Sequence, residues 1–151
     1  YDDAMNNALQ AINIDNNSAI AHAYLAEIYA DEGNIPRARE EMQQAINLDD
    51  KSPLIWRNYG YVWEKAGQYK KAITAYQEAL KLLPNFAYVY MAMGRNELAL
   101  QRVDPAIDAF QHARAINPKD PQPYDAIGWT YVLNDNYQRG IAELRKAMEI
   151  D

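Results

Sequence analysis

Residues 53–86 read PLIWRNYGYVWEKAGQYKKAITAYQEALKLLPNF, and this stretch decides the fold. Apolar residues recur every three or four positions on both sides of a break at residues 66–68, which is the spacing of two amphipathic helices. Gly67 suits the left-handed backbone just past a helix end, and Pro84 stops a second helix. The stretch therefore predicts a pair of helices joined by a tight turn.

The same features recur along the chain with a fixed period. Gly60 and Gly94 stand 34 residues apart, and so do Ala72 and Ala106. One column of this period holds alanine at every position: Ala11, Ala45, Ala79, Ala113 and Ala147. Small residues at a fixed phase let two helix backbones approach closely. We therefore expect a stack of tight helix pairs.

This spacing resembles the tetratricopeptide repeat, whose 34-residue signature is W-x2-L-G-x2-Y, then A-x3-F, then P. The matches within residues 53–86 are Trp56, Gly60, Ala72, Ala79 and Pro84. The resemblance covers the whole chain, with repeat units at residues 19–52, 53–86, 87–120 and 121–151, and with residues 1–18 as the second helix of a truncated unit. It implies an all-α fold, a right-handed superhelical solenoid of antiparallel helix pairs forming a single array over residues 1–151.

Composition excludes several classes of function. A net charge of -6 opposes the attraction to phosphates that drives nucleic-acid binding, and no apolar run is long enough for a membrane helix. Without cysteine there is no thiolate site, and the two histidines, His22 and His112, fall in different repeats with no third ligand spaced to join them. We therefore expect no catalytic residue, no metal and no cofactor, and take the chain as a non-enzyme with the cytoplasm as its default location.

The resemblance also implies where a partner would bind, because first helices line the concave surface of such solenoids. Arginine and aromatic residues, which are enriched in binding hot spots, occur in the columns that face this surface. The candidate groove residues are Glu27, Arg57, Tyr61, Tyr88, Met91, Arg95, Asp125 and Trp129. The alternative interpretation is that Tyr88 and Trp129 merely pack against a neighbouring helix.

Two local features of the sequence concern which side chains are buried. In the stretch from Trp56 to Tyr69, the core columns take Trp56, Tyr59, Trp63 and Tyr69, which leaves only Tyr61 for the groove. Glu97 occupies a core column that holds an aromatic residue in the other units, and a carboxylate buried alone would be costly. Either a local shift turns Glu97 to solvent, which we favour, or it makes a polar contact to a ligand.

The predicted function is a scaffold that holds a peptide segment of a partner protein in its groove. The clamp with which related domains hold acidic chaperone tails is missing, since in one register only Asn58 matches it and in the next only Arg57. Two alternatives stay open. The chain could self-associate through uncapped ends of the solenoid, or it could be the repeat region of a larger and possibly enzymatic protein.

Overall fold

The computed structural model describes residues 2–150, and residues 1 and 151, the two ends of the predicted array, lie outside them. The regular structure between residues 2 and 150 is entirely α-helical. The helices are α1 (Asp2–Ile14), α2 (Ala19–Asp31), α3 (Ile35–Leu48), α4 (Pro53–Lys65), α5 (Tyr69–Leu82), α6 (Ala87–Ala99), α7 (Val103–Ile116), α8 (Pro121–Leu133) and α9 (Tyr137–Ile150). Each pair predicted from the 34-residue period is present.

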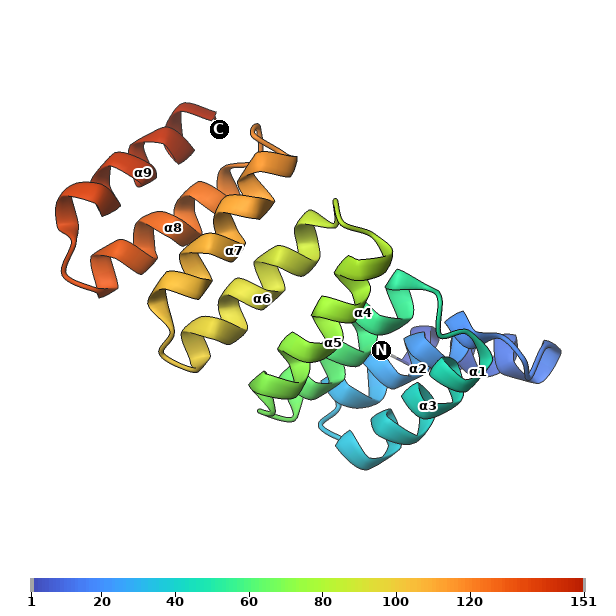
Figure 1. Ribbon diagram of the computed structural model, residues 1–151. Helices are drawn as coiled ribbons and strands as arrows, with labels where there is room; N and C mark the ends of the chain where they lie inside the picture. Colours follow the sequence, from blue (N-terminus) through green and yellow to red (C-terminus); the bar gives the residue numbers. More distant parts are fainter. Residues whose placement is uncertain (1, 151) are drawn as a thin grey trace. The chain divides into compact units, whose positions relative to one another are not determined.

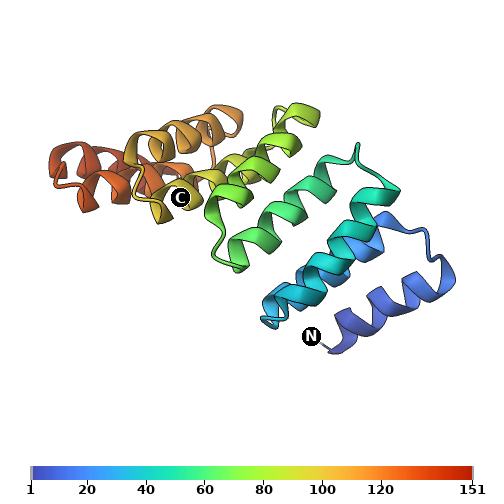
Figure 2. The same cartoon turned by 60° about the horizontal axis from the view of Figure 1, so that its bottom comes forward.

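The chain forms two compact units, Tyr1–Pro84 and Asn85–Asp151, which we call unit 1 and unit 2. In unit 1, α2 pairs with α3 and α4 with α5, and in unit 2, α6 pairs with α7 and α8 with α9 (Figure 1). The helix α1 lies at one edge of unit 1 and packs on α2 (Figure 2). Within each unit the successive pairs also pack on each other, through α2, α3 and α4 in unit 1 and through α7 and α8 in unit 2.

The turns inside the four pairs share one geometry. Gly33 and Gly67 adopt φ of 78° and 69°, and the corresponding residues in unit 2, Gln101 and Asp135, adopt φ of 60° and 59°. In each turn the next amide donates a hydrogen bond to the carbonyl five residues earlier, as from Gln68 N to Trp63 O at 2.9 Å. This is a Schellman turn, which satisfies the last carbonyls of the first helix and reverses the chain.

The small-residue columns lie where the paired helices touch. Gly60 of α4 faces the buried ring of Tyr76 on α5, and a Cβ added to Gly60 would lie 2.4 Å from a ring carbon. Gly94 of α6 meets the ring of Phe110 on α7 in the same way, at 2.3 Å. Only glycine leaves room for these two rings, so each of these glycines and the ring that faces it specify each other.

The aromatic stretch of α4 divides largely as predicted. Trp63 is buried, while Trp56 and Tyr59 are half-buried and contact each other edge to face with their ring centroids 6.1 Å apart. The ring of Tyr59 also contacts that of Trp63, with centroids 5.5 Å apart. These rings therefore stabilise the helix pair.

The favoured prediction for Glu97 is wrong. Its side chain is turned inward rather than to solvent, and Glu97 is buried. Its carboxylate accepts a hydrogen bond from the guanidinium of Arg102 at 3.4 Å, within an ion pair across the turn between α6 and α7. The half-exposed arginine pairs with the carboxylate and so offsets part of the cost of burying its charge.

Candidate functional site

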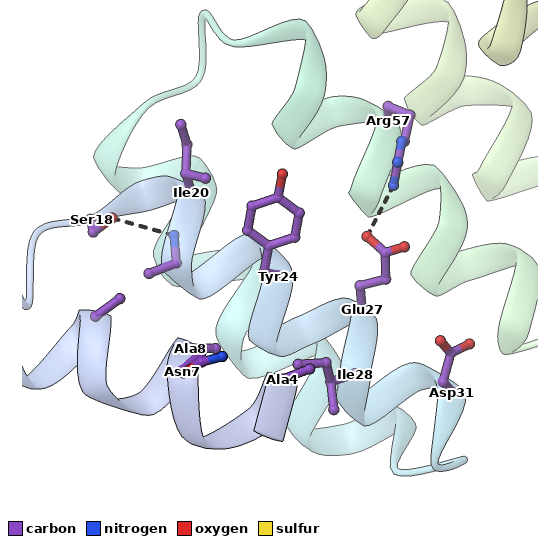
Figure 3. A pocket seen from close by; sticks show the side chains of 12 residues that line it. Ala4, Asn7, Ala8, Ser18, Ile20, Tyr24, Glu27, Ile28, Asp31 and Arg57 are labelled. Carbon is purple, nitrogen blue, oxygen red and sulfur yellow. Dashed lines mark hydrogen bonds and ion pairs between the residues drawn. The ribbon is translucent and has the colours of Figure 1, made fainter. Parts of the chain in front are cut away.

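Unit 1 contains an open pocket of about 510 Å³ beside α1 and α2 (Figure 3). The helix α1 lines it with small side chains, and α2 lines it with larger ones. The principal contributors are Ala4, Asn7, Ala8 and Ala11 from α1 and Ile20, Tyr24 and Ile28 from α2. Tyr24 stands up from α2 in the middle of this surface, 49% exposed, and Ile20 beside it is equally exposed. The pocket is therefore mainly apolar.

One edge of the pocket is polar. Glu27 of α2 accepts a hydrogen bond from Arg57 of α4 at 3.0 Å, and both side chains are half-buried. At the C-terminal end of α2, Asp31 forms an ion pair with Lys65 at 2.8 Å and accepts a hydrogen bond from the Tyr61 hydroxyl. The charges of this edge are thus arranged in pairs that join α2 to α4.

These pairs shift the ionisation of their members. Burial, followed by the hydrogen bond to Asp31, raises the pKa of Tyr61 to about 12. Burial acts to raise the pKa of Asp31, but hydrogen bonds from Lys65 and Tyr61 outweigh it and lower that pKa. The hydrogen bond to Asp31, with a smaller one to Tyr61, raises the pKa of Lys65. At neutral pH the group is therefore a carboxylate, a neutral phenol and an ammonium.

The predicted groove residues of unit 2 differ in exposure. Tyr88 on α6 and Trp129 on α8 are 44% and 56% exposed, and Arg95 and Asp125 are exposed as well. Met91 is half-buried and packs on the core cluster of Ala106, Ile107, Phe110 and Ile127. Unit 2 thus presents two large aromatic rings and two charges from its first helices.

Three side chains at or near the pocket are missing from the candidate groove residues. Tyr24 lies in a column that otherwise holds Asn58, Ala92 and Ala126, which gave no sign of an exposed ring. Asp31 and Lys65 end their helices and are not among the candidate groove residues. Their 34-residue separation was the available signal, because it places an acid and a base at the same position of consecutive first helices.

Among residues 2–150 there is no group of three or more His, Asp or Glu side chains placed to hold a metal ion. The polar groups at the pocket edge are paired with each other. The described helices also include none with the length and apolar character needed to cross a membrane.

Comparison with known families decides what the repeat is. Residues 53–86 and residues 121–151 each match a model of the tetratricopeptide repeat. The chain contains tetratricopeptide repeats. This repeat generally serves as a non-enzymatic scaffold for protein interactions, and the all-α helix pairs described above agree with that general class.

Solved structures of this fold match nearly the whole chain. MamA superposes with a TM-score of 0.83 at 23% identity, covering 97% of this chain and 85% of its own. PilF of Pseudomonas aeruginosa gives 0.82 at 23% identity, with 95% and 66% covered. YrrB, described as a TPR protein with an unusual peptide-binding site, gives 0.76 at 21% identity, with 99% and 77% covered. No curated protein matches the chain in sequence. At these identities the likeness shows the fold, an all-α solenoid of helix pairs.

Proposed function

We propose that the chain is a scaffold that binds a peptide segment of a partner protein along the exposed face of its first helices. The observation that carries the proposal is the exposure of Trp129, a tryptophan with 56% of its surface accessible in the middle of α8. Tyr88 and Arg95 are exposed on α6, the preceding first helix of unit 2. YrrB, which shares the fold, is described as having a peptide-binding site.

Physical chemistry favours this face. A tryptophan or tyrosine ring offers a large apolar area that loses little conformational entropy on binding, and arginine adds a charged donor beside it. Exposed rings of this size leave apolar surface in water, and a partner that covers them gains the hydrophobic free energy. Arg95 enters no ion pair among the described residues, so its guanidinium is available to a carboxylate or carbonyl of the peptide.

In unit 1 the predicted groove residues have a different role in the proposal. Arg57 is held by Glu27, and Tyr61 is held by Asp31 and packs on the core cluster of α2, α3 and α4. A peptide that contacts Arg57 and Tyr61 would not have to order these side chains, because they are already held in place. It would bury less exposed apolar surface on them than on Trp129. We therefore expect Trp129 to contribute more to affinity than Tyr61.

A library of displayed peptides tests the proposal. Peptides selected on the wild-type chain should lose about 2 kcal/mol or more of binding free energy, roughly 30-fold in Kd, when Trp129→Ala removes the ring. The matched control is Tyr137→Ala, because Tyr137 is 57% exposed but lies on the second helix α9. If selected peptides bind Trp129→Ala and the combined Tyr61→Ala, Trp129→Ala variant as tightly as the wild type, the first-helix face is not the site.

A further inference from the structure

Two hollows beside α4 meet at one tyrosine ring in unit 1. The first, of about 400 Å³, lies between α3 and α4, and its lining includes Arg39 and Tyr59. The second, of about 230 Å³, lies between α4 and α5, and its lining includes Tyr59, Trp63 and Lys71, together with Trp56. Because Tyr59 lines both hollows, they form one open depression, which we call the α3–α5 groove.

Two cations lie over the ring of Trp63, a side chain that is almost completely buried. The guanidinium carbon of Arg39 is 4.9 Å from the ring centroid, and the ammonium nitrogen of Lys71 is 4.4 Å from it. Since both distances are measured to the same point, the two charges are at most about 9 Å apart, within the Debye length of about 10 Å at 0.1 M salt. Their mutual repulsion is therefore only partly screened, and an anion placed between them would relieve it.

No carboxylate in the described part of the chain neutralises these cations. Neither Arg39 nor Lys71 enters an ion pair among residues 2–150. Glu40 is the one acid among the described residues that line the two hollows, and it forms its ion pair within α3, at 4.0 Å. The only acid on α5, Glu78, is paired with Lys81. The α3–α5 groove is therefore locally positive in a chain whose net charge is -6.

We propose that the α3–α5 groove binds an acidic segment of a partner protein. A carboxylate of the segment lies between Arg39 and Lys71 and accepts charge-assisted hydrogen bonds from both. The contact with Trp63 already orders the two cations, so they lose little conformational freedom on binding. An apolar side chain of the segment covers the half-buried rings of Trp56 and Tyr59. Clustered cations are a recurrent means of recognising an acidic motif in a peptide.

Charge and structure favour a flexible segment of another protein over a second copy of this chain. A second copy also has a net charge of -6, so the two copies repel each other as they approach. Residues 2–150 lie in helices and short turns, so the described part of a second copy offers no extended segment that could lie across Tyr59 and reach both hollows. A free carboxylate ion would fill only the space between the cations and would leave the rings uncovered.

This surface differs from the peptide-binding face of α6 and α8. The residues that line the α3–α5 groove all belong to unit 1, whereas Trp129, which carries the other proposal, belongs to unit 2. The two proposals can therefore fail independently.

The test uses the chain with Trp129→Ala, which lacks the ring that carries the other proposal. The two remaining tryptophans, Trp56 and Trp63, both line the α3–α5 groove, so intrinsic tryptophan fluorescence reports on this groove alone. A library of displayed random peptides is selected on this chain and then depleted on the same chain carrying Arg39→Gln and Lys71→Gln. The surviving peptides are synthesised, and their binding is measured by the change in tryptophan emission.

The matched control is Lys70→Gln, which removes the same charge from the same helix at an exposed position outside both hollows. The surviving peptides should be enriched in Asp or Glu beside apolar residues. Arg39→Gln and Lys71→Gln should each weaken their binding by more than about tenfold, and replacing the acid of the peptide by its amide should do the same. Lys70→Gln should weaken it by less than about twofold, because a charge outside the groove acts only through the screened field.

The proposal is overturned if no peptide survives the depletion, if the survivors show no excess of acids, or if Lys70→Gln and Lys71→Gln weaken binding equally. A dimer in sedimentation that Lys71→Gln abolishes would make a second copy the occupant. If the protein from its natural source excludes the peptides while residues 1–151 bind them, a segment of the same chain is the occupant. Either of these two results refutes the assignment to a partner protein.

Discussion

Replacing Gly60 by alanine tests whether the contact between α4 and α5 requires a glycine at this position. The added Cβ would lie 2.4, 2.5 and 2.8 Å from three carbons of the Tyr76 ring, well inside van der Waals contact. Tyr76 is 0% exposed, and its hydroxyl donates a hydrogen bond to Glu64 at 2.9 Å. Core packing and this hydrogen bond therefore restrict movement of the ring. The clash must be relieved by moving α4 away from α5.

Two opposing effects set the magnitude. Alanine is better than glycine in a helix interior by about 1 kcal/mol, which by itself would stabilise α4. Overpacking a core typically costs about 1–3 kcal/mol, and three contacts this short place Gly60→Ala at or above the upper end of that range. We expect a net loss of about 2 kcal/mol or more in the free energy of unfolding, which corresponds to a fall of roughly 4–8 °C or more in Tm for a chain of this size.

Thermal and urea unfolding of Gly60→Ala, Tyr76→Leu and the double variant provide the assay. Tyr76→Leu alone destabilises by loss of packing, but in its background the added methyl group meets no ring, so Gly60→Ala should cost little or become favourable. Gly67→Ala is the control, because nothing lies within 4 Å of its Cβ and its φ of 69° costs an alanine about 1 kcal/mol of strain with either residue at position 76. If Gly60→Ala stabilises the wild type, or if Tyr76→Leu does not relieve it, the packing argument fails.

Two further predictions concern the turn and the ionised group. Gln101→Gly should raise the free energy of unfolding by roughly 0.5–1 kcal/mol, because glycine adopts the φ of 60° without strain. Asp135→Gly should raise it by less, because this variant loses the hydrogen bond from Tyr137. A lower Tm for Gln101→Gly would contradict the prediction. Tyr61 stabilises the fold only while its hydroxyl is neutral. Its pKa is about 12 in the folded chain and 10.0 in a model compound. Its contribution to the free energy of unfolding is therefore complete below about pH 10 and is lost as the pH rises from 10 to 12. In phenolate absorbance titrations that use Tyr61→Phe to identify the signal, Asp31→Asn should move this pKa downward, and an unchanged value would exclude the hydrogen bond as a cause.

The sequence predicted the helices well because their ends depend on local chemistry. Gly33 and Gly67 mark two of the four turns, and Gln101 and Asp135 adopt the same left-handed backbone because the column, rather than the residue type, requires it. The burial of the alanine column from residue 45 onward followed from the same logic, since close helix packing leaves no room for larger side chains. Periodicity therefore carried information about packing even where individual residues departed from the signature.

The repeat period did not predict the orientation of the Glu97 side chain. The column correctly marked its position as core, but the cost of a buried carboxylate led to the opposite conclusion about its orientation. The compensating residue, Arg102, lies across a turn whose geometry brings residue i+5 back over residue i, and its amide donates to the Glu97 carbonyl at 2.9 Å. Because a charge penalty depends on the partner in space, it cannot be judged from a column of the repeat.

The columns of the repeat did not predict the pocket of unit 1, for a different reason. Adding 34 to a residue number transfers a role only if both repeats have the same neighbours, and α1 and α2 do not have the neighbours of α3 and α4. Ala8 stands where Met42 fills the core, and Tyr24 stands where Asn58 is sealed beneath α2. A column therefore predicts which side of a helix a residue occupies, but the adjacent helix determines whether that side is buried or exposed.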